Sequence, residues 1–458
     1  MTKYERQKGD YCVLKKMIAI ITSVIILLTP IQASAVTWGE IVTGLRASDT
    51  FTSGETAAAR TSDGEYVISG GKIDDPVEVS ALQFSDSLKV LFRNIGIEQL
   101  NAHEDSGKTI AVILGSGSEV KGRVNVSAHG KDTNLSLTNE GKMGSLNAIV
   151  HNQAQASIKN NGEITGGMNS EVHGEGSRLE FVNDKEGRIT GGMDNGVSEK
   201  GELVFTNNGT ISGEHLFNGA FDGGMLKNTN NGTMNVTNDR LHNYARGGGS
   251  FVESTNNGTI NGEVMNQADH EGSRNVAANH GTVNGQYEFY TGDGGEVVGE
   301  NNGTVNSLYA GADGGQVSAV NNGKVKEEIR ADASDESMKA DVTVINNGEA
   351  DRMYVSAGEN GTLNVENNGR LTGDGKTWIT IEWEDGEFSR ELSGELSIDV
   401  WDKGGTANVT NNGSAAAAFI GAADGANASL RNDGQIGNGE GVPLSSYAAE
   451  NGRLTVTG

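Results

Sequence analysis

The sequence predicts an all-β fold in which one chain winds into a single-stranded parallel β-helix, or β-solenoid, with about 15 coils of ~22 residues. Three observations predict it. The motif Asn-Asn-Gly, or a close variant, recurs along most of the chain. A small residue lies eight positions before most of the motif glycines. Between the two, apolar and polar residues alternate, as in residues 316–320, which is typical of a half-buried strand.

The motif glycines set the period of the repeat. Successive glycines are 20 to 26 residues apart, except for one step of 44 residues from Gly369 to Gly413. Because no second kind of turn divides the coil, we interpret Asn-Gly as a solenoid corner and not as a β-hairpin turn. The motif glycines are Gly141, Gly162, Gly187, Gly209, Gly232, Gly258, Gly281, Gly303, Gly323, Gly348, Gly369, Gly413 and Gly434.

The asparagine next to the motif glycine is expected to form a ladder along the stack. Its side-chain amide carries both a donor and an acceptor, so asparagines of successive coils can bond to one another. Asparagine and glycine also tolerate the left-handed backbone conformation, which suits a sharp corner. The residues assigned to this turn ladder are Asn208, Gly209, Asn231, Gly232, Asn257, Gly258, Asn302, Gly303, Asn322, Gly323, Asn347, Gly348, Asn368, Gly369, Asn412 and Gly413.

This combination of period and turn chemistry resembles the right-handed parallel β-helix of pectate lyases and of bacterial autotransporter passengers and adhesins. The resemblance covers roughly residues 85–458, and no catalytic motif shares in it. It implies a right-handed rod at a bacterial cell surface. The residues themselves do not determine the hand of the winding.

Residues 1–35 are expected to be a secretory signal peptide, which predicts a secreted or cell-surface protein. Lys15 and Lys16 precede an apolar run over residues 17–28, and the small residues 33–35 provide a cleavage site. The alternatives are an uncleaved anchor and a true start nearer Val13. Residues 36–84 lack the motif and are expected to form an N-terminal cap, since a solenoid needs its first coil covered.

The repeats are expected over residues 85–458, with an irregular or inserted coil at 370–405. That region is interpreted either as a coil without the motif or as a strand pair that projects around Asp385 and Gly386. The last strand, residues 452–458, stops before a turn. An uncapped end predicts end-to-end association with a partner, or else a chain truncated at Gly458.

Composition narrows the classes of function. The 67 glycines among 458 residues suit a fold with many corners. Removing residues 1–35 takes away 5 of 35 basic and 2 of 61 acidic residues, which leaves 30 against 59 and a net charge of −29. This charge disfavours nucleic acid and anionic membranes as partners. Cys12, the single cysteine, lies within the expected signal, and no membrane span is expected in the mature chain.

The residues that could carry chemistry show no catalytic, metal or cofactor pattern. Carboxylates scatter through the variable stretches, and a pair such as Glu382 and Glu384 is interpreted as part of a solvated face. The eight histidines, including His270 and His280, show no metal-ligand spacing. The Asp-Gly-Gly corners are similar to calcium-binding nonapeptide repeats but lack their spacing, so a turn role is favoured. These corners begin at Asp222, Asp293 and Asp313.

Two sets of residues are candidates for binding. Trp378, Trp383 and Trp401 are candidate glycan-binding residues, since exposed aromatic faces suit sugar rings. Packing of a local insertion is the alternative interpretation. A threonine column is similar to the arrays of ice-binding β-solenoids, although a plain β-branched ladder is favoured. Its members are Thr210, Thr233, Thr259, Thr282 and Thr304.

The sequence therefore predicts a secreted or cell-surface, non-enzymatic β-helix rod that serves as an adhesin-like or structural binding scaffold. Its expected partner is a host or environmental glycan or protein. One alternative is a carbohydrate-active β-helix enzyme of the polysaccharide lyase or hydrolase type. The other is binding to ice or to a polymer surface through the Thr/Asn array.

Overall fold

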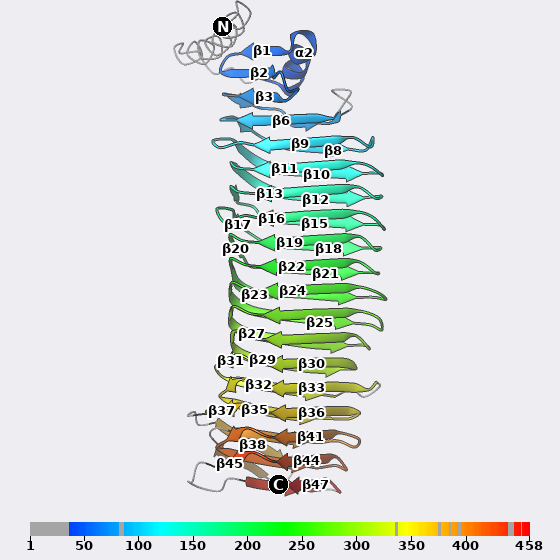
Figure 1. The fold of residues 1–458 in the computed structure, drawn as a ribbon, viewed down its shortest axis with the longest axis vertical. Coiled ribbons are helices and arrows are strands. Elements are labelled where there is room, and N and C mark those ends of the chain that lie inside the picture. Colours follow the sequence, from blue (N-terminus) through cyan, green and yellow to red (C-terminus); the bar gives the residue numbers. More distant parts are fainter. Residues whose placement is uncertain are drawn as a thin grey trace, which may run out of the picture.

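The computed structural model describes residues 36–81, 87–334, 338–373, 377–383, 386–392, 395–437, 444–449 and 451–458. These residues form a rod of stacked parallel coils, with about 15 turns spaced about 23 residues apart along the chain (Figure 1). The all-β solenoid predicted from the sequence is confirmed. The expected signal peptide, residues 1–35, lies outside the described residues.

Each coil contains three strand segments; the first segments of successive coils build one longitudinal sheet, and the second and third segments together build another. In one coil these are β19 (Glu202–Asn207), β20 (Thr210–Gly213) and β21 (Leu216–Phe221), which we call the first, second and third strands. The first strand ends at the motif, the second follows the motif glycine, and the third leads to the far corner. Each strand pairs in parallel with its equivalent in the next coil, so β19 lies between β16 and β22.

The first strands run from one end of the rod to the other. They are β3 (Tyr66–Ser69), β6 (Leu88–Arg93), β9 (Thr109–Leu114), β11 (Asn134–Asn139), β13 (Gln155–Asn160), β16 (Arg178–Asn183), β19, β22 (Met225–Asn230), β24 (Phe251–Asn256), β26 (Arg274–Asn279), β28 (Glu296–Asn301), β30 (Gly315–Asn321), β33 (Ala340–Asn346), β36 (Gly361–Asn367), β41 (Thr406–Asn411), β44 (Asn427–Asn432) and β47 (Arg453–Thr457).

The second and third strands are separate in some coils and continuous in others. Separate second strands are β4 (Lys72–Ile73), β7 (Gly96–Ile97), β14 (Glu163–Ile164), β17 (Arg188–Thr190), β20, β31 (Lys324–Val325), β34 (Glu349–Ala350), β37 (Arg370–Leu371), β42 (Ser414–Ala415) and β45 (Gln435–Ile436). Separate third strands are β5 (Val77–Val79), β8 (Leu100–Glu104), β15 (Met168–His173), β18 (Met193–Ser198), β21, β32 (Glu328–Ala333), β35 (Arg352–Ala357), β40 (Glu395–Val400), β43 (Ala417–Ala422) and β46 (Leu444–Ala448). The continuous strands are β10 (Glu119–His129), β12 (Lys142–His151), β23 (Thr233–Arg246), β25 (Thr259–Asp269), β27 (Thr282–Gly292) and β29 (Thr304–Asp313).

The core is a narrow column inside the rod. Alternate residues of every strand point inward, so β19 buries Leu203, Phe205 and Asn207 while the residues between them are half-buried. Like residues stack along the rod because the coils are in register; Phe181 and Phe205, for example, have ring centroids 5.3 Å apart. The hydrophobic effect and the backbone ladders therefore act along the whole length.

The motif glycines are required for a different reason from the expected one. Among the described residues, none of the motif glycines has a positive φ. A Cβ on Gly303 would instead lie 2.0 Å from the carbonyl oxygen of Gly281 in the preceding coil. Left-handed residues occur at the far corner, where Asp293 (φ 51°) and Gly294 (φ 89°) form an Asp-Gly-Gly turn. Close coil-to-coil approach, and not a left-handed backbone, thus explains the glycine of the motif.

The N-terminal segment covers the first coil. The helix α2 (Trp38–Ser48) starts at a capping box formed by Thr37 and Glu40, and it buries Trp38 and Ile41 against the rod. The Trp38 indole N–H donates to the carbonyl oxygen of Glu78 at 2.7 Å. The strands β1 (Thr50–Ser53) and β2 (Thr56–Arg60) pair antiparallel with each other and β2 with β3. The segment 36–84, expected as a cap, thus contains α2, this antiparallel sheet and the first coil, β3–β5.

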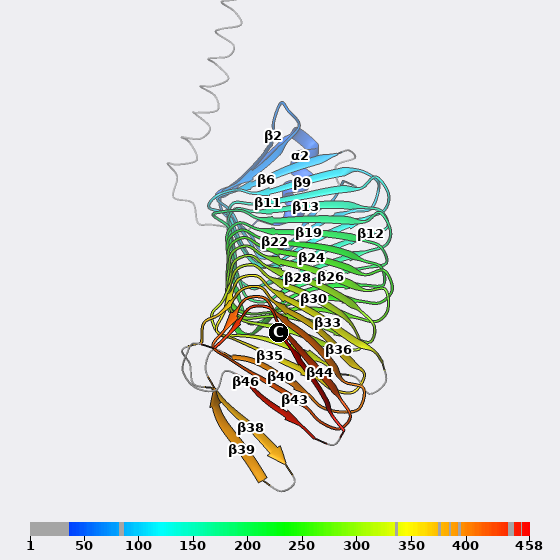
Figure 2. The ribbon, with the colours of Figure 1, turned by 60° about the horizontal axis from the view of Figure 1, so that its bottom comes forward.

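The step of 44 residues is one coil with an insertion. The strand β36 pairs directly with β41, and β35 pairs directly with β40, so no coil lies between them. The extra residues include an antiparallel hairpin of β38 (Thr377–Trp383) and β39 (Gly386–Leu392), which projects from the rod (Figure 2). Residues 370–405 were interpreted either as a coil without the motif or as a projecting strand pair. The structure contains the projecting strand pair.

Candidate functional site

The structure describes only part of the expected tryptophan cluster. Trp378 and Trp383 belong to the projecting hairpin, and their side chains lie outside the described part of the structure. Trp401 follows β40, is 45% exposed, and donates its indole N–H to Ser356 Oγ at 3.1 Å. The described residues therefore place one of the three tryptophans at the rod surface.

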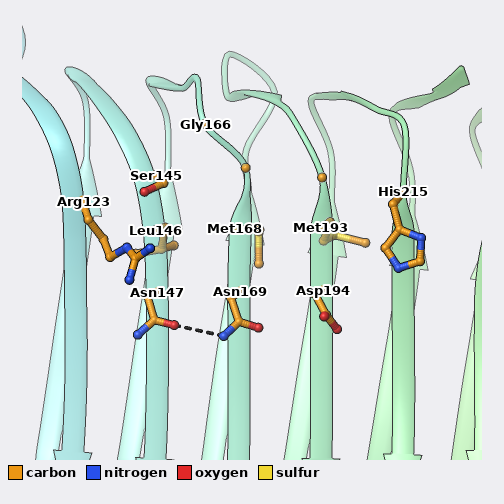
Figure 3. A pocket seen from close by; sticks show the side chains of 12 residues that line it. Arg123, Ser145, Leu146, Asn147, Gly166, Met168, Asn169, Met193, Asp194 and His215 are labelled. Carbon is orange, nitrogen blue, oxygen red and sulfur yellow. Dashed lines mark hydrogen bonds between the residues drawn. The ribbon is translucent and has the colours of Figure 1, made fainter.

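A more complete candidate site lies on the outward side of the third strands, which we call the third face. A hollow of about 400 Å³ crosses several coils there (Figure 3). Asn147 of β12, Asn169 of β15 and Asp194 of β18 stand side by side along it. Arg123 lies at one end and His215 at the other. We call this feature the glycine hollow.

Two glycines create the hollow. Successive coils have four residues at one equivalent position, as the backbone hydrogen bonds between the coils show. In chain order this row contains Ser145, Gly167, Gly192 and His215, so the two middle coils have glycine. A Cβ on Gly167, whose φ is 82°, would lie 2.6 Å from the carbonyl oxygen of Gly192. The row therefore has no side chains over two coils. The sequence signal is a Thr-Gly-Gly-Met repeat, at residues 165–168 and 190–193, which the sequence analysis missed.

Hydrogen bonds and burial tune the polar side of the glycine hollow. The Asn169 amide donates to Asn147 Oδ1 at 3.0 Å and to Glu171 Oε1 at 2.9 Å. Burial raises the pKa of Asp194, and the nearby Glu171 carboxylate raises it further, while His215 acts in the opposite direction. In this row the amides can donate and accept hydrogen bonds and the carboxylate can accept them, which suits a ligand rich in hydroxyl groups.

Beyond His215 the third face becomes aromatic. Phe217 and Phe221 lie over Gly219, with ring centroids 6.3 Å apart and planes at 22°. A Cβ on Gly219 would lie 2.6 Å from both rings, so glycine is needed for this arrangement. The His215 ring is stacked nearly parallel to Phe217, with the two planes at 7°, and the ring centroid of Tyr244 in the next coil lies 6.0 Å from that of Phe221.

These rings form one surface that continues the glycine hollow. We call it the aromatic plate, and its members are His215, Phe217, Phe221, His242 and Tyr244. Flat aromatic faces that remain partly exposed are typical of recognition surfaces. The sequence signal is alternation, since Phe217, Gly219 and Phe221 occupy alternate positions of β21, and His215, which directly precedes the strand, continues the same spacing.

Further along the third face the side chains are charged as well as aromatic. Arg330 lies over the rings of Tyr309 and Tyr354, at 6.0 and 5.3 Å, and forms an ion pair of 2.6 Å with Asp332. Burial raises the pKa of Asp332 despite this pairing. Burial also raises the pKa of Glu288 and of Asp399 on the same face.

Four of the eight histidines stack on the third face, which the sequence spacing did not reveal. His103, His129, His151 and His173 have successive ring centroids 5.7, 5.0 and 4.6 Å apart. We call them the histidine stack. In the part of the chain that the structure describes, no group of three or more His, Cys, Asp or Glu side chains is arranged to hold a metal ion.

The two asparagines of the motif form two separate ladders. The second asparagines, expected as the turn ladder, are exposed except for the half-buried Asn208; Asn322, for example, donates to Asn302 Oδ1 at 2.9 Å. We call this column the outer ladder. The first asparagines are buried, except for the half-buried Asn432 at the end of the column, and form an inner ladder of bonds of 2.7 to 2.8 Å. Its members are Asn139, Asn160, Asn183, Asn207, Asn230, Asn256, Asn279, Asn301, Asn321, Asn346, Asn367, Asn411 and Asn432.

The threonine column lies in register on the second strands, next to the outer ladder. Thr259 pairs with Thr233 and Thr282, and each of these side chains is half-buried. Two positions further on, Asn261 donates to Asn235 Oδ1 and Asn284 donates to Asn261 Oδ1, both at 2.8 Å. This surface is polar and carries no charge over these coils.

No family model, curated protein or solved structure matches the chain. No helix among the described residues is both long and apolar enough to cross a membrane.

Proposed function

We propose that this chain is a secreted or cell-surface, non-enzymatic rod that binds an extended glycan along the third face. The aromatic plate beside the glycine hollow carries the proposal. Sugar rings have apolar faces that pack on aromatic rings, and their edges carry hydroxyl groups for hydrogen bonds. Phe217 and Phe221 supply the stacking surface, while Asn147, Asn169 and Asp194 supply donors and acceptors.

The dimensions of the site fit a linear ligand. Neighbouring strands of a sheet are about 4.8 Å apart, so the hollow and the plate, from β12 to β23, span about 20 Å along the rod. This length accommodates several consecutive sugar units. The rigid β-helix holds the contacts in place before binding, which lowers the entropy lost on association.

Glycan-array binding of the purified chain tests this function. Phe217→Ala combined with Phe221→Ala is expected to weaken binding at least about tenfold, because aromatic anchors dominate such interfaces. Tyr290→Ala is the matched control, since Tyr290 is a half-buried aromatic residue of the same face further along the rod. Equal binding by the double variant, or equal loss in the control, contradicts the proposal.

One observation favours the second candidate, a carbohydrate-active enzyme. Burial raises the pKa of Glu288, Asp332 and Asp399, and a raised pKa is typical of the carboxyl group that serves as general acid in enzymes acting on sugars. Release of reducing ends or unsaturated products from soluble polysaccharides tests it. Activity that disappears in Asp332→Asn and Asp399→Asn favours the enzyme, whereas a chain that binds glycan without releasing product excludes it.

A further inference from the structure

The outer ladder contains the dipeptide most prone to spontaneous chemical change. In an Asn-Gly step, the backbone nitrogen of glycine can attack the side-chain carbon Cγ of asparagine. The new N–C bond closes a succinimide ring and the amide leaves as ammonia. Water then opens the ring at either carbonyl, which gives aspartate or isoaspartate. Every asparagine of the outer ladder is followed by glycine, and most are exposed.

The coil stack holds the attacking nitrogen of these steps. The Gly303 N–H donates to the carbonyl oxygen of Asn279 at 3.0 Å, and the Gly323 N–H donates to that of Asn301 at 3.0 Å. Each acceptor is an inner asparagine of the preceding coil. A nitrogen whose hydrogen bond lies along the stack must lose that bond before it can turn toward its own side chain.

The outer ladder holds the other reacting group. The Asn322 amide donates to Asn302 Oδ1 at 2.9 Å, and its own Oδ1 accepts from Asn347 at 2.8 Å. Rotation of the amide toward the backbone breaks these bonds as well. Both restraints, the glycine N–H bond and at least one side-chain bond, occur at seven residues: Asn231, Asn257, Asn302, Asn322, Asn347, Asn368 and Asn412.

Asn161 is in the same column without these restraints. Its neighbours in the column are Glu140 and Asp184, and the Asp184 carboxylate pairs with Lys159 at 2.9 Å. Within the described part of the chain, neither the Asn161 side chain nor the Gly162 N–H makes a hydrogen bond. Asn161 is half-exposed, so water reaches it.

We propose that Asn161 is a site of spontaneous deamidation in this rod, and that the two ladders protect the seven restrained Asn-Gly steps from the same reaction. The substrate is the protein itself, and water is the co-reactant. The repeated motif thus combines a reactive dipeptide with a fold that blocks its reaction. This inference is independent of glycan binding.

Peptide mapping by mass spectrometry tests the proposal on the full chain aged in mildly alkaline buffer. Asn161 is expected to convert at least about tenfold faster than Asn322 and Asn347, a ratio that corresponds to about 1.4 kcal/mol. In denaturant, where both restraints are lost, the three rates are expected to become similar. Similar rates in the folded chain, or an Asn161 that stays unmodified, would overturn the assignment.

A variant shows whether the outer ladder itself, and not the general rigidity of the rod, protects Asn322 from deamidation. Asn302→Ala combined with Glu300→Ala removes both acceptors of the Asn322 amide, Asn302 Oδ1 and Glu300 Oε1, each at 2.9 Å, and neither side chain is buried, so the fold tolerates the truncation. Deamidation at Asn322 is expected to rise in this variant, whereas Asn368, which keeps its partners, serves as the internal control. An unchanged rate at Asn322 would show that the ladder does not protect it.

Discussion

The inner and outer ladders are built from the same amide–amide hydrogen bond but differ in exposure to water and in direction. Asn301 and Asn302 are adjacent in the chain, and each hydrogen-bonds to a side chain in a neighbouring coil. Asn301 is 0% exposed, whereas Asn302 is exposed. In the inner ladder the amides donate toward the C-terminal coils, and in the outer ladder toward the N-terminal coils. The amide–amide hydrogen bond is therefore shielded from water in the inner ladder, whereas in the outer ladder water competes for the same donors and acceptors.

This difference determines how much each ladder stabilises the rod. A broken inner bond leaves a buried donor or acceptor without a partner, whereas a broken outer bond is replaced by water. Within the inner ladder each asparagine therefore needs another asparagine in the adjoining coil, and the column is unbroken from Asn139 to Asn432, whereas the coil before Asn139 has Leu114 at this position. The outer ladder tolerates substitution, and His280 takes the place of asparagine in one coil.

A buried charge is expected to give the largest contrast between the ladders. Asn301→Asp places a carboxylate against Asn321 Oδ1, so two acceptors face each other without a compensating cation. The free energy of unfolding is expected to fall by about 3–5 kcal/mol. Asn302→Asp, the adjacent control, is expected to change it by less than about 0.5 kcal/mol. Urea denaturation measures both, and equal shifts would show that the ladders are energetically alike.

Replacement by leucine sharpens the comparison within the core. Asn301→Leu leaves Asn321 Oδ1 without its donor and leaves the Asn279 amide with only its 3.4 Å bond to the carbonyl oxygen of Gly281, which is expected to cost about 2–3 kcal/mol of unfolding free energy. Asn228 is equally buried, but its single side-chain bond to Asn243 is long, at 3.4 Å, and its Oδ1 has no partner. Asn228→Leu is therefore expected to be neutral or stabilising by about 1 kcal/mol. A large loss in both variants would mean that burial alone, and not membership of the ladder, explains the cost.

The histidine stack is expected to have the smallest effect on the stability of the rod. It makes the stability depend on pH, which the outer asparagine ladder does not. Burial and neighbouring imidazoles lower the pKa of His129 and His151, and the carboxylate of Glu171 opposes the change at His151. The unfolded chain then binds more protons than the folded chain as the pH falls below about 6.5, so stability decreases toward acid. Thermal unfolding across this range measures it.

Matched variants assign that pH dependence to the stack. His151→Asn interrupts the stack at its centre and is expected to flatten the decrease between neutral and mildly acidic pH. His280→Asn, which makes the outer ladder uniform, is expected to leave the profile unchanged. An unaltered profile in His151→Asn would exclude the stack as its origin.

Much of the fold follows from local patterns. The period, the alternation and the repeated corner predicted a solenoid because each is set within a few residues. Alternation also shows which asparagine is buried: Val317, Ala319 and Asn321 share one side of β30, so Asn321 points inward with the apolar residues. The predicted turn ladder contains Asn322, next to the glycine, and therefore corresponds only to the exposed column.

The candidate site was less accessible from the sequence. The tryptophans of residues 378–401 were the predicted aromatic binding residues. The aromatic plate instead contains Phe217 and Tyr244, which belong to different coils. Coil lengths vary, so the spacing along the chain does not say which outward residues become neighbours. For the same reason, the sequence does not show that the four histidines of the histidine stack are neighbours.

The sequence by itself determined that this chain folds as a stack of short coils closed by a repeated polar corner, since strand alternation and turn chemistry are local properties. Only the tertiary structure decided which side chains meet across coils, where glycines open a hollow, and that the longest step carries a hairpin. The physical reason is register. Hydrogen bonds between parallel strands align residues that are 20 to 26 or, once, 44 positions apart, and no local preference encodes that alignment.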